Sequence, residues 1–184
     1  MKTTVHHTCR KEGTKENILQ NAPFKAEYNE NEQKLQFLGS GYYFWDNNIE
    51  MARFWGKKHY QSDYYIIEAT LELKKSYFLD LVGNREHMIY FMKLKETFKK
   101  FGFDREKWSM GHFIEFLKKL ELDEKKGVFP FKIIRALDYS PNTKYSDKVN
   151  FVGNKKNYTL LNPRIIICLI EIIDNILYDK KIVS

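Results

Sequence analysis

The chain has few of the residues on which several common classes of protein depend. Only two of its 184 residues are cysteine, Cys9 and Cys168, and neither has a second cysteine at CxxC spacing. This excludes a disulfide framework and a cysteine-based zinc or redox motif, and we expect two free thiols in a reducing cytosol. The longest apolar run, residues 165–170, has six residues, far short of the roughly 18 that a membrane helix needs.

Targeting and metal-binding signals are also missing. Lys2 is not followed by an apolar stretch, so we predict neither a secretory signal nor a stop-transfer segment and expect a cytoplasmic protein. His59 and His87 have no partners at metal-ligand spacing, which predicts that both are surface or loop residues. Walker, nucleophile-elbow and zinc-cluster motifs are absent from the sequence. We therefore expect no metal site.

The composition that is present favours a folded domain with a basic surface. Hydrophobic residues make up 43% of the chain, aromatic residues 16% and charged residues 30%, which supports a core and argues against disorder. The length favours a single domain spanning residues 1–184. A net charge of +7 suits an acidic partner such as nucleic acid, although a lysine-rich composition from AT-rich coding would give the same excess.

The periodicity of apolar residues predicts an α+β fold. Alternation in residues 64–73 indicates a half-buried strand, and further strands are predicted at residues 3–9, 42–45, 77–81, 131–137, 149–151 and 165–170. A helix is predicted at residues 14–20, and a second helix begins after Asn47 or Asn48 and ends near Gly56. Residues 85–126 have a helical period and are predicted to form a two-helix insertion hinged near Gly102.

A glycine-containing turn leads directly into an aromatic strand at residues 39–45. Glycine allows backbone angles that other residues avoid and lets a backbone approach a ligand closely, while the aromatic residues favour a pleated surface. A hairpin turn into a core strand is the simpler interpretation. The pair His6-His7 near the N-terminus has the same two interpretations, a site or surface polar sequence.

Together, separated segments resemble the ADP-ribosyltransferase catalytic domain, in the branch of the poly(ADP-ribose) polymerases and their bacterial mono-transferase relatives. Val5-His6-His7-Thr8 is similar to the family's strand-borne His-Gly-Thr or His-Gly-Ser. Residues 38–44, Leu-Gly-Ser-Gly-Tyr-Tyr-Phe, are similar to its Gly-x-Gly-Ile-Tyr-Phe, and Ala52 and Phe54 follow where the family commonly has an alanine and a second aromatic residue. The resemblance covers residues 4–70 in order and 159–176 more loosely.

The resemblance implies a split antiparallel sheet with a helical insertion at about residues 85–126, and NAD as substrate. His6 would hydrogen-bond a ribose hydroxyl, His7 would offer its backbone to the nicotinamide amide, and Thr8 would offer its hydroxyl. Tyr43 and Phe54 would stack on the two faces of the nicotinamide. The predicted site comprises His6, Tyr43 and Arg164 as catalytic residues, and His6, His7, Thr8, Gly41, Tyr43 and Phe54 as NAD-binding residues.

Arg164 stands where the family has a glutamate on a late strand, just before the apolar run 165–170. Arginine stays protonated and cannot act as a general base, but it can hold a phosphate of NAD or of the acceptor. Transfer of one ADP-ribose is therefore expected, without chain elongation. A solvated strand end is the alternative for Arg164, in which case Glu171 or Glu68 would have to activate the acceptor.

These observations lead to one main functional hypothesis and two alternatives. The main hypothesis is an NAD-dependent mono-ADP-ribosyltransferase that modifies a macromolecule, with nucleic acid slightly favoured over protein. A toxin or defence role, with an antitoxin or inhibitor as partner, would suit such an enzyme. The first alternative is a catalytically inactive NAD-binding module. The second is a ribonuclease toxin that uses Arg105 and His112, which fit a loose Arg-x(4–6)-His pattern on a predicted helix.

Overall fold

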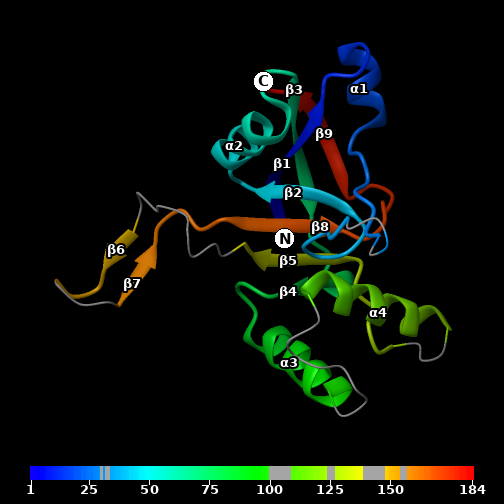
Figure 1. Ribbon diagram of the computed structural model, residues 1–184, viewed down its shortest axis with the longest axis vertical. Helices are drawn as coiled ribbons and strands as arrows, with labels where there is room; N and C mark the ends of the chain where they lie inside the picture. Colours follow the sequence, from blue (N-terminus) through cyan, green and yellow to red (C-terminus); the bar gives the residue numbers. More distant parts are fainter. Residues whose placement is uncertain (30, 32–33, 100–108, 124–126, 139–147, 154–156) are drawn as a thin grey trace.

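The computed structural model describes residues 1–29, 31, 34–99, 109–123, 127–138, 148–153 and 157–184. Their order along the chain is β1 (Lys2–Arg10), α1 (Lys15–Asn21), β2 (Tyr42–Asp46), α2 (Ile49–Tyr60), β3 (Tyr64–Glu72), the 3₁₀ turn η1 (Lys75–Tyr77), β4 (Phe78–Asp80), α3 (Arg85–Lys99), α4 (Met110–Asp123), β5 (Ile133–Leu137), β6 (Lys148–Asn150), β7 (Tyr158–Leu160), β8 (Ile165–Leu169) and β9 (Leu177–Ile182) (Figure 1). The predicted α+β class is confirmed.

Seven strands form one mixed sheet in the order β4-β5-β8-β2-β1-β3-β9. The predicted antiparallel arrangement is wrong for β4 and β5, which pair in parallel, whereas the other five pairs are antiparallel. The reason is the connection, because α3 and α4 lie between β4 and β5 in the chain and return it so that β5 runs in the same direction as β4. The two helices of the predicted insertion are thus present, while Gly102 lies outside the described residues.

The sheet has a narrow junction between β1 and β2. These strands share only the pairs Val5↔Asp46 and His6↔Trp45, whereas β1 and β3 are paired from Lys2 to Arg10. Figure 1 shows β2, β8 and β5 running across the view, while β1 and β3 rise toward its top. Beyond His6 the imidazole of His7, instead of the β1 backbone, reaches the backbone oxygen of Tyr43. Two half-sheets therefore diverge from this junction.

The two faces of β1 are covered by different helices because successive residues of a strand point to opposite sides. Cys9 packs in a cluster with Ile18 of α1, whereas Thr8 donates a hydrogen bond from Oγ1 to the backbone oxygen of Ala52 in α2 at 3.0 Å. At the other half-sheet, α3 and α4 pack on β4, β5 and β8. That cluster contains Leu79, Phe91, Phe113, Ile114, Leu117, Ile134 and Cys168.

Both predicted N-terminal caps are present, but one predicted helix end is wrong. Thr14 caps α1, and Asn48 accepts a hydrogen bond from the Met51 amide at the start of α2. Helix α2 continues through Gly56 to Tyr60. A Cβ at Gly56 would lie 2.5 Å from the ring of Tyr64, so this glycine provides room for β3 and does not end the helix.

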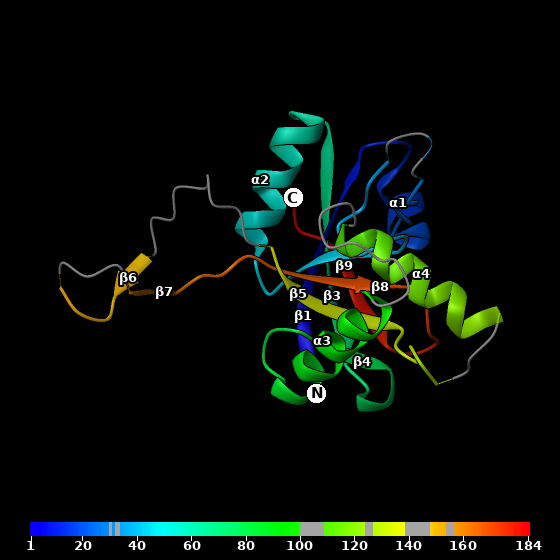
Figure 2. The same ribbon diagram turned by 60° about the horizontal axis from the view of Figure 1, so that its bottom comes forward.

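Two strand pairings were not predicted from the sequence. Strand β9 completes the edge beside β3, and β7 pairs with β6, the strand that corresponds to the predicted 149–151, in a hairpin that projects from the rest of the molecule (Figure 2). In the chain, this hairpin lies between β5 and β8. Within the described ranges, no helix combines the length and apolar character needed to cross a membrane.

Candidate functional site

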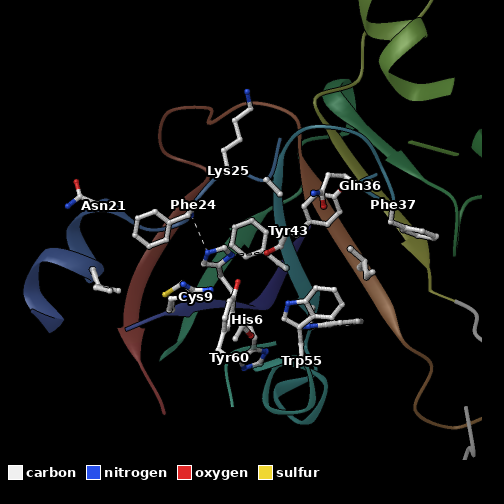
Figure 3. A pocket seen from close by; sticks show the side chains of 18 of the residues that line it. His6, Cys9, Asn21, Phe24, Lys25, Gln36, Phe37, Tyr43, Trp55 and Tyr60 are labelled. Atoms are coloured by element: carbon white, nitrogen blue, oxygen red, sulfur yellow. Dashed lines mark hydrogen bonds between the residues drawn. The ribbon is translucent and has the colours of Figure 1, made fainter. Parts of the chain in front are cut away.

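A cavity of about 850 Å³ lies where the two half-sheets diverge. Its lining comes from the C-terminal part of β1, from β2, α1 and α2, from residues 24–26 and 35–37 between α1 and β2, and from Asp138 and Ile166. Figure 3 shows Phe24, Tyr43, Trp55 and Tyr60 gathered around it from three separate parts of the chain. The volume is within the range of sites for small molecules and cofactors.

His6 is buried and lines this cavity from β1. Its Nε2 lies 3.2 Å from Oε2 of Glu68 on the neighbouring strand β3. Burial lowers the pKa of His6, and this effect exceeds the opposing influence of the Glu68 carboxylate. His6 is therefore neutral at pH 7, with one ring nitrogen engaged by Glu68.

His7 uses both ring nitrogens to hold the junction together. Its Nε2 accepts a hydrogen bond from the Phe24 amide at 3.1 Å, so Nδ1 carries the proton and donates to the Tyr43 oxygen at 2.9 Å (Figure 3). Burial lowers the pKa of His7, in keeping with this neutral form. The imidazole therefore fixes residue 24 beside β1 and β2, a structural task beyond the backbone role expected of His7.

Tyr43 lines the cavity with its hydroxyl held by the preceding turn. The hydroxyl donates to the Gly39 oxygen at 2.6 Å and accepts from the Leu38 amide at 2.8 Å. Burial is the main cause that raises the pKa of Tyr43. The orientation of the ring is thus set by residues 38–39 and not by a ligand.

Gly41 and Phe54, two expected NAD-binding residues, do not line the cavity. Gly41 packs against β8, since a Cβ there would lie 2.4 Å from Sγ of Cys168, and its backbone pairs with Ala26, which does line the cavity. Phe54 is 49% exposed. Its neighbour Trp55 lines the cavity instead, because the helical rotation of 100° per residue turns position 55 toward β2.

Of the two interpretations of Arg164, the solvated strand end is wrong, and the phosphate-holding role stays a prediction. Its side chain is only 13% exposed and forms an ion pair with Asp138, so it is not a solvated strand end. The guanidinium carbon also lies 5.8 Å from the ring of Trp45. Arg164 itself does not line the cavity, whereas Asp138 does, which places a paired carboxylate where a phosphate-holding arginine was expected.

Thr8 lines the cavity as predicted, whereas Glu171, His112, His59 and His87 do not. Glu171 is 53% exposed and pairs with Lys132. His112 lies on α4 beside the ring of Tyr28, and Arg105 is outside the described residues. His59 stacks on Trp55, while His87, expected on a surface or loop, belongs to α3 and accepts a hydrogen bond from the Asp80 amide. The described residues contain no group of three or more potential metal ligands.

Sequence reasoning missed Phe24, Phe37 and Asp138 as cavity residues. For Phe24, the available signal was an aromatic residue in a mainly polar segment. Helix α4 is hydrogen-bonded to the turn that precedes β2. Glu115 Oε1 accepts a hydrogen bond from the Ser40 amide, and Lys118 donates one to the Ser40 backbone oxygen at 3.1 Å. These contacts connect residues far apart in sequence, so no local pattern reveals them.

Comparison with protein-family models, curated proteins and solved structures found no match for this chain. The fold and cavity define an α+β protein with a ligand-sized site between two half-sheets.

Proposed function

We propose that this protein is an NAD-dependent mono-ADP-ribosyltransferase that attaches one ADP-ribose to a macromolecular acceptor. One observation carries the proposal. The segment His6-His7-Thr8 and the residue Tyr43, which the family resemblance singled out in separate parts of the sequence, line the same cavity. The divergence of two half-sheets at this point supports the split-sheet form of the fold.

The chemistry of the cavity suits nicotinamide transfer. Cleavage of the bond between nicotinamide and ribose passes through a cation-like sugar, so the site has to hold a flat aromatic leaving group and orient the ribose. Tyr43 and Trp55 offer aromatic surface for the ring, and His6 and Thr8 offer polar atoms for hydroxyl groups. Trp55 takes the part that the resemblance assigned to Phe54.

Nucleic acid is the favoured acceptor class, ahead of protein. The chain has a net charge of +7, and the last turn of α2, beside the cavity-lining Trp55, contains Lys57, Lys58 and His59. Such a basic surface attracts phosphates at physiological salt. An antitoxin or inhibitor protein that covers the cavity would be the partner expected for a toxin.

A catalytically inactive NAD-binding module is the second candidate. It is favoured by Arg164, which replaces the family glutamate with a cation and is ion-paired to Asp138. The ribonuclease hypothesis receives less support, because His112 lies outside the cavity lining.

The test is incubation of the protein with NAD labelled in the adenylate phosphate, together with separate pools of RNA, DNA and protein. Transfer of label to one pool with release of nicotinamide is the expected result. Binding of NAD without release would favour the inactive module, and cleavage of RNA without label would favour a ribonuclease. A protein that neither binds nor cleaves NAD would overturn the proposal.

A further inference from the structure

We propose that Asp138, held in place by Arg164, binds the hydroxyl groups of the ribose that carries nicotinamide. This inference rests on the proposed function, which makes NAD the ligand of the cavity, and it deepens that function by assigning a residue that selects the sugar. Asp138 touches the substrate, whereas Arg164 acts through Asp138 as a positioning residue.

The carboxylates that line the cavity are not the ones that the sequence suggested. Glu68 and Glu171 do not belong to the described lining, whereas Glu12 and Asp138 do. The Glu12 side chain is 74% exposed. The Asp138 side chain is 21% exposed, so its carboxylate is accessible and yet partly enclosed by the protein. Asp138 is therefore the better placed of the two to hold a ligand in one orientation.

Strand pairing turns Asp138 toward the face of the sheet that borders the cavity. The Asp138 amide donates a hydrogen bond to the Arg164 backbone oxygen at 2.7 Å, which continues the antiparallel pairing of β5 with β8. Directly opposite residues point to the same face, and so do residues two apart on one strand. Asp138 thus shares a face with Ile166, which lies opposite Trp45 on β2. Ile166 and Trp45 both line the cavity, as Asp138 does.

Arg164 fixes the position of the Asp138 carboxylate. Its Nη2 donates to Asp138 Oδ2, and its guanidinium carbon lies 5.8 Å from the centre of the Trp45 ring. The Arg164 side chain is mostly buried and does not itself line the cavity. A carboxylate has two oxygens and about four acceptor sites, so one arginine contact leaves capacity for hydroxyl donors of a ligand.

The carboxylate lies at the aromatic end of the cavity. The ring of Trp45 is in contact with Arg164 on one side and with Trp55 on another, at 6.3 Å between the two indole centres. Trp55 is the residue on which the nicotinamide ring is proposed to stack, and the ribose is joined directly to that ring. Adjacent ribose hydroxyls are hydrogen-bond donors, and their bonds to a charged acceptor are about twice as strong as neutral ones.

Asp138→Asn is the test, with Glu12→Gln as its matched control. Each variant removes one negative charge from a side chain that lines the cavity and keeps nearly the same shape. The ligands are NAD and two NAD analogues, one without the 2′-hydroxyl and one without the 3′-hydroxyl of the nicotinamide ribose. Calorimetry gives Kd for each ligand with each protein, and urea unfolding shows that the variants are folded.

We expect the wild type to bind at least one analogue about 10-fold or more weakly than NAD, and Glu12→Gln to show the same ratio. In Asp138→Asn the ratio should fall several-fold, because the variant has lost the charged acceptor that the missing hydroxyl would have met. Arg164→Lys, which retains the positive charge but loses the planar fork, should lower the ratio to an intermediate value.

A purely structural role of the ion pair would weaken the binding of NAD and of both analogues by the same factor, so the ratio would not change. An unchanged ratio in Asp138→Asn, or a wild type that binds both analogues as tightly as NAD, would overturn this inference and leave the proposed function intact. The measurements on the wild type decide this even where a variant does not fold. A wild type that does not bind NAD at all would overturn the proposed function and this inference together.

Discussion

At the scale of single residues, the adjacent histidines His6 and His7 of β1 differ in their contacts, because successive side chains of a strand point to opposite faces of the sheet. Both ring nitrogens of His7 form hydrogen bonds, one to the Tyr43 oxygen and one from the Phe24 amide. In His6 one ring nitrogen is bonded to Glu68, and the other has no partner among the described residues. A histidine with both nitrogens bonded holds structure, whereas a buried nitrogen without a partner is rare and needs a reason. The pair His6-His7 thus combines a structural support with a residue that the family resemblance predicts to be catalytic.

Burial of these histidines predicts acid sensitivity of the fold. The pKa of both His6 and His7 is lowered from the ordinary value of 6.5. Below pH 6.5 the unfolded chain binds protons that the folded protein does not, so their contribution to stability is complete above pH 6.5 and is lost as the pH falls toward the folded pKa. Urea unfolding at pH 7.5 and 5.5 should show this loss.

The variant His7→Gln isolates the contribution of one histidine. It removes a titrating group, so the decrease in unfolding free energy between pH 7.5 and 5.5 should be smaller than in the wild type, although the variant is less stable at both values. Equal pH dependence in the two proteins would mean that His7 does not titrate on unfolding.

At the scale of elements, α2 presents adjacent aromatic residues to different surroundings. Trp55 lines the cavity and Phe54, the next residue, is 49% exposed outside it. Trp55→Ala should weaken NAD binding by about 1–3 kcal/mol, the effect of one large aromatic side chain at a binding site. Phe54→Ala is the matched control, with an expected change below about 0.5 kcal/mol. Calorimetry measures the NAD affinity of both variants. A larger loss of affinity in Phe54→Ala than in Trp55→Ala would show that Phe54 stacks on the nicotinamide, as the family resemblance implies.

Helix α4 and the turn before β2 are packed backbone against backbone. A Cβ added at Gly111 would lie 2.0 Å from the Gln36 oxygen and 3.1 Å from the Gly39 nitrogen. Gly111→Ala should therefore displace the cavity wall and lower the free energy of unfolding by about 1–3 kcal/mol, as overpacking does.

Gly153→Ala serves as the control for Gly111→Ala, because a Cβ there meets no atom within 4 Å. The two variants should be compared by urea unfolding. A Gly111→Ala protein as stable as Gly153→Ala would show that α4 adjusts without loss of stability, and that the part of the cavity lining formed by residues 35–37 tolerates more than its packing indicates.

At the scale of the whole molecule, the site exists because the two half-sheets diverge. β1 and β2 share two residue pairs, and the lining of the cavity comes from elements on both sides of that junction. A ligand in such a position contacts both half-sheets and stabilises only the folded arrangement. The free energy of unfolding should rise by about 2.7 kcal/mol when NAD is present at 100 times its Kd.

Thermal unfolding in the presence and absence of NAD measures this effect. At the same NAD concentration the unfolding midpoint of Trp55→Ala should rise less than that of the wild type, since a larger Kd reduces the stabilisation by NAD. An equal rise in midpoint for both proteins would place the NAD site away from the cavity.

The sequence by itself determined the α+β class, most of the strands and the caps of α1 and α2, because these depend on local periodicity and on side chains three residues from the amides they bind. It did not reveal β9, or that Gly56 makes room for Tyr64, because strand pairing and close packing depend on residues distant in sequence. Only the tertiary structure decided that Trp55 lines the cavity, that Arg164 pairs with Asp138 and that Glu68 contacts His6. Each of these outcomes depends on helix rotation or strand register, which nearby residues alone do not fix.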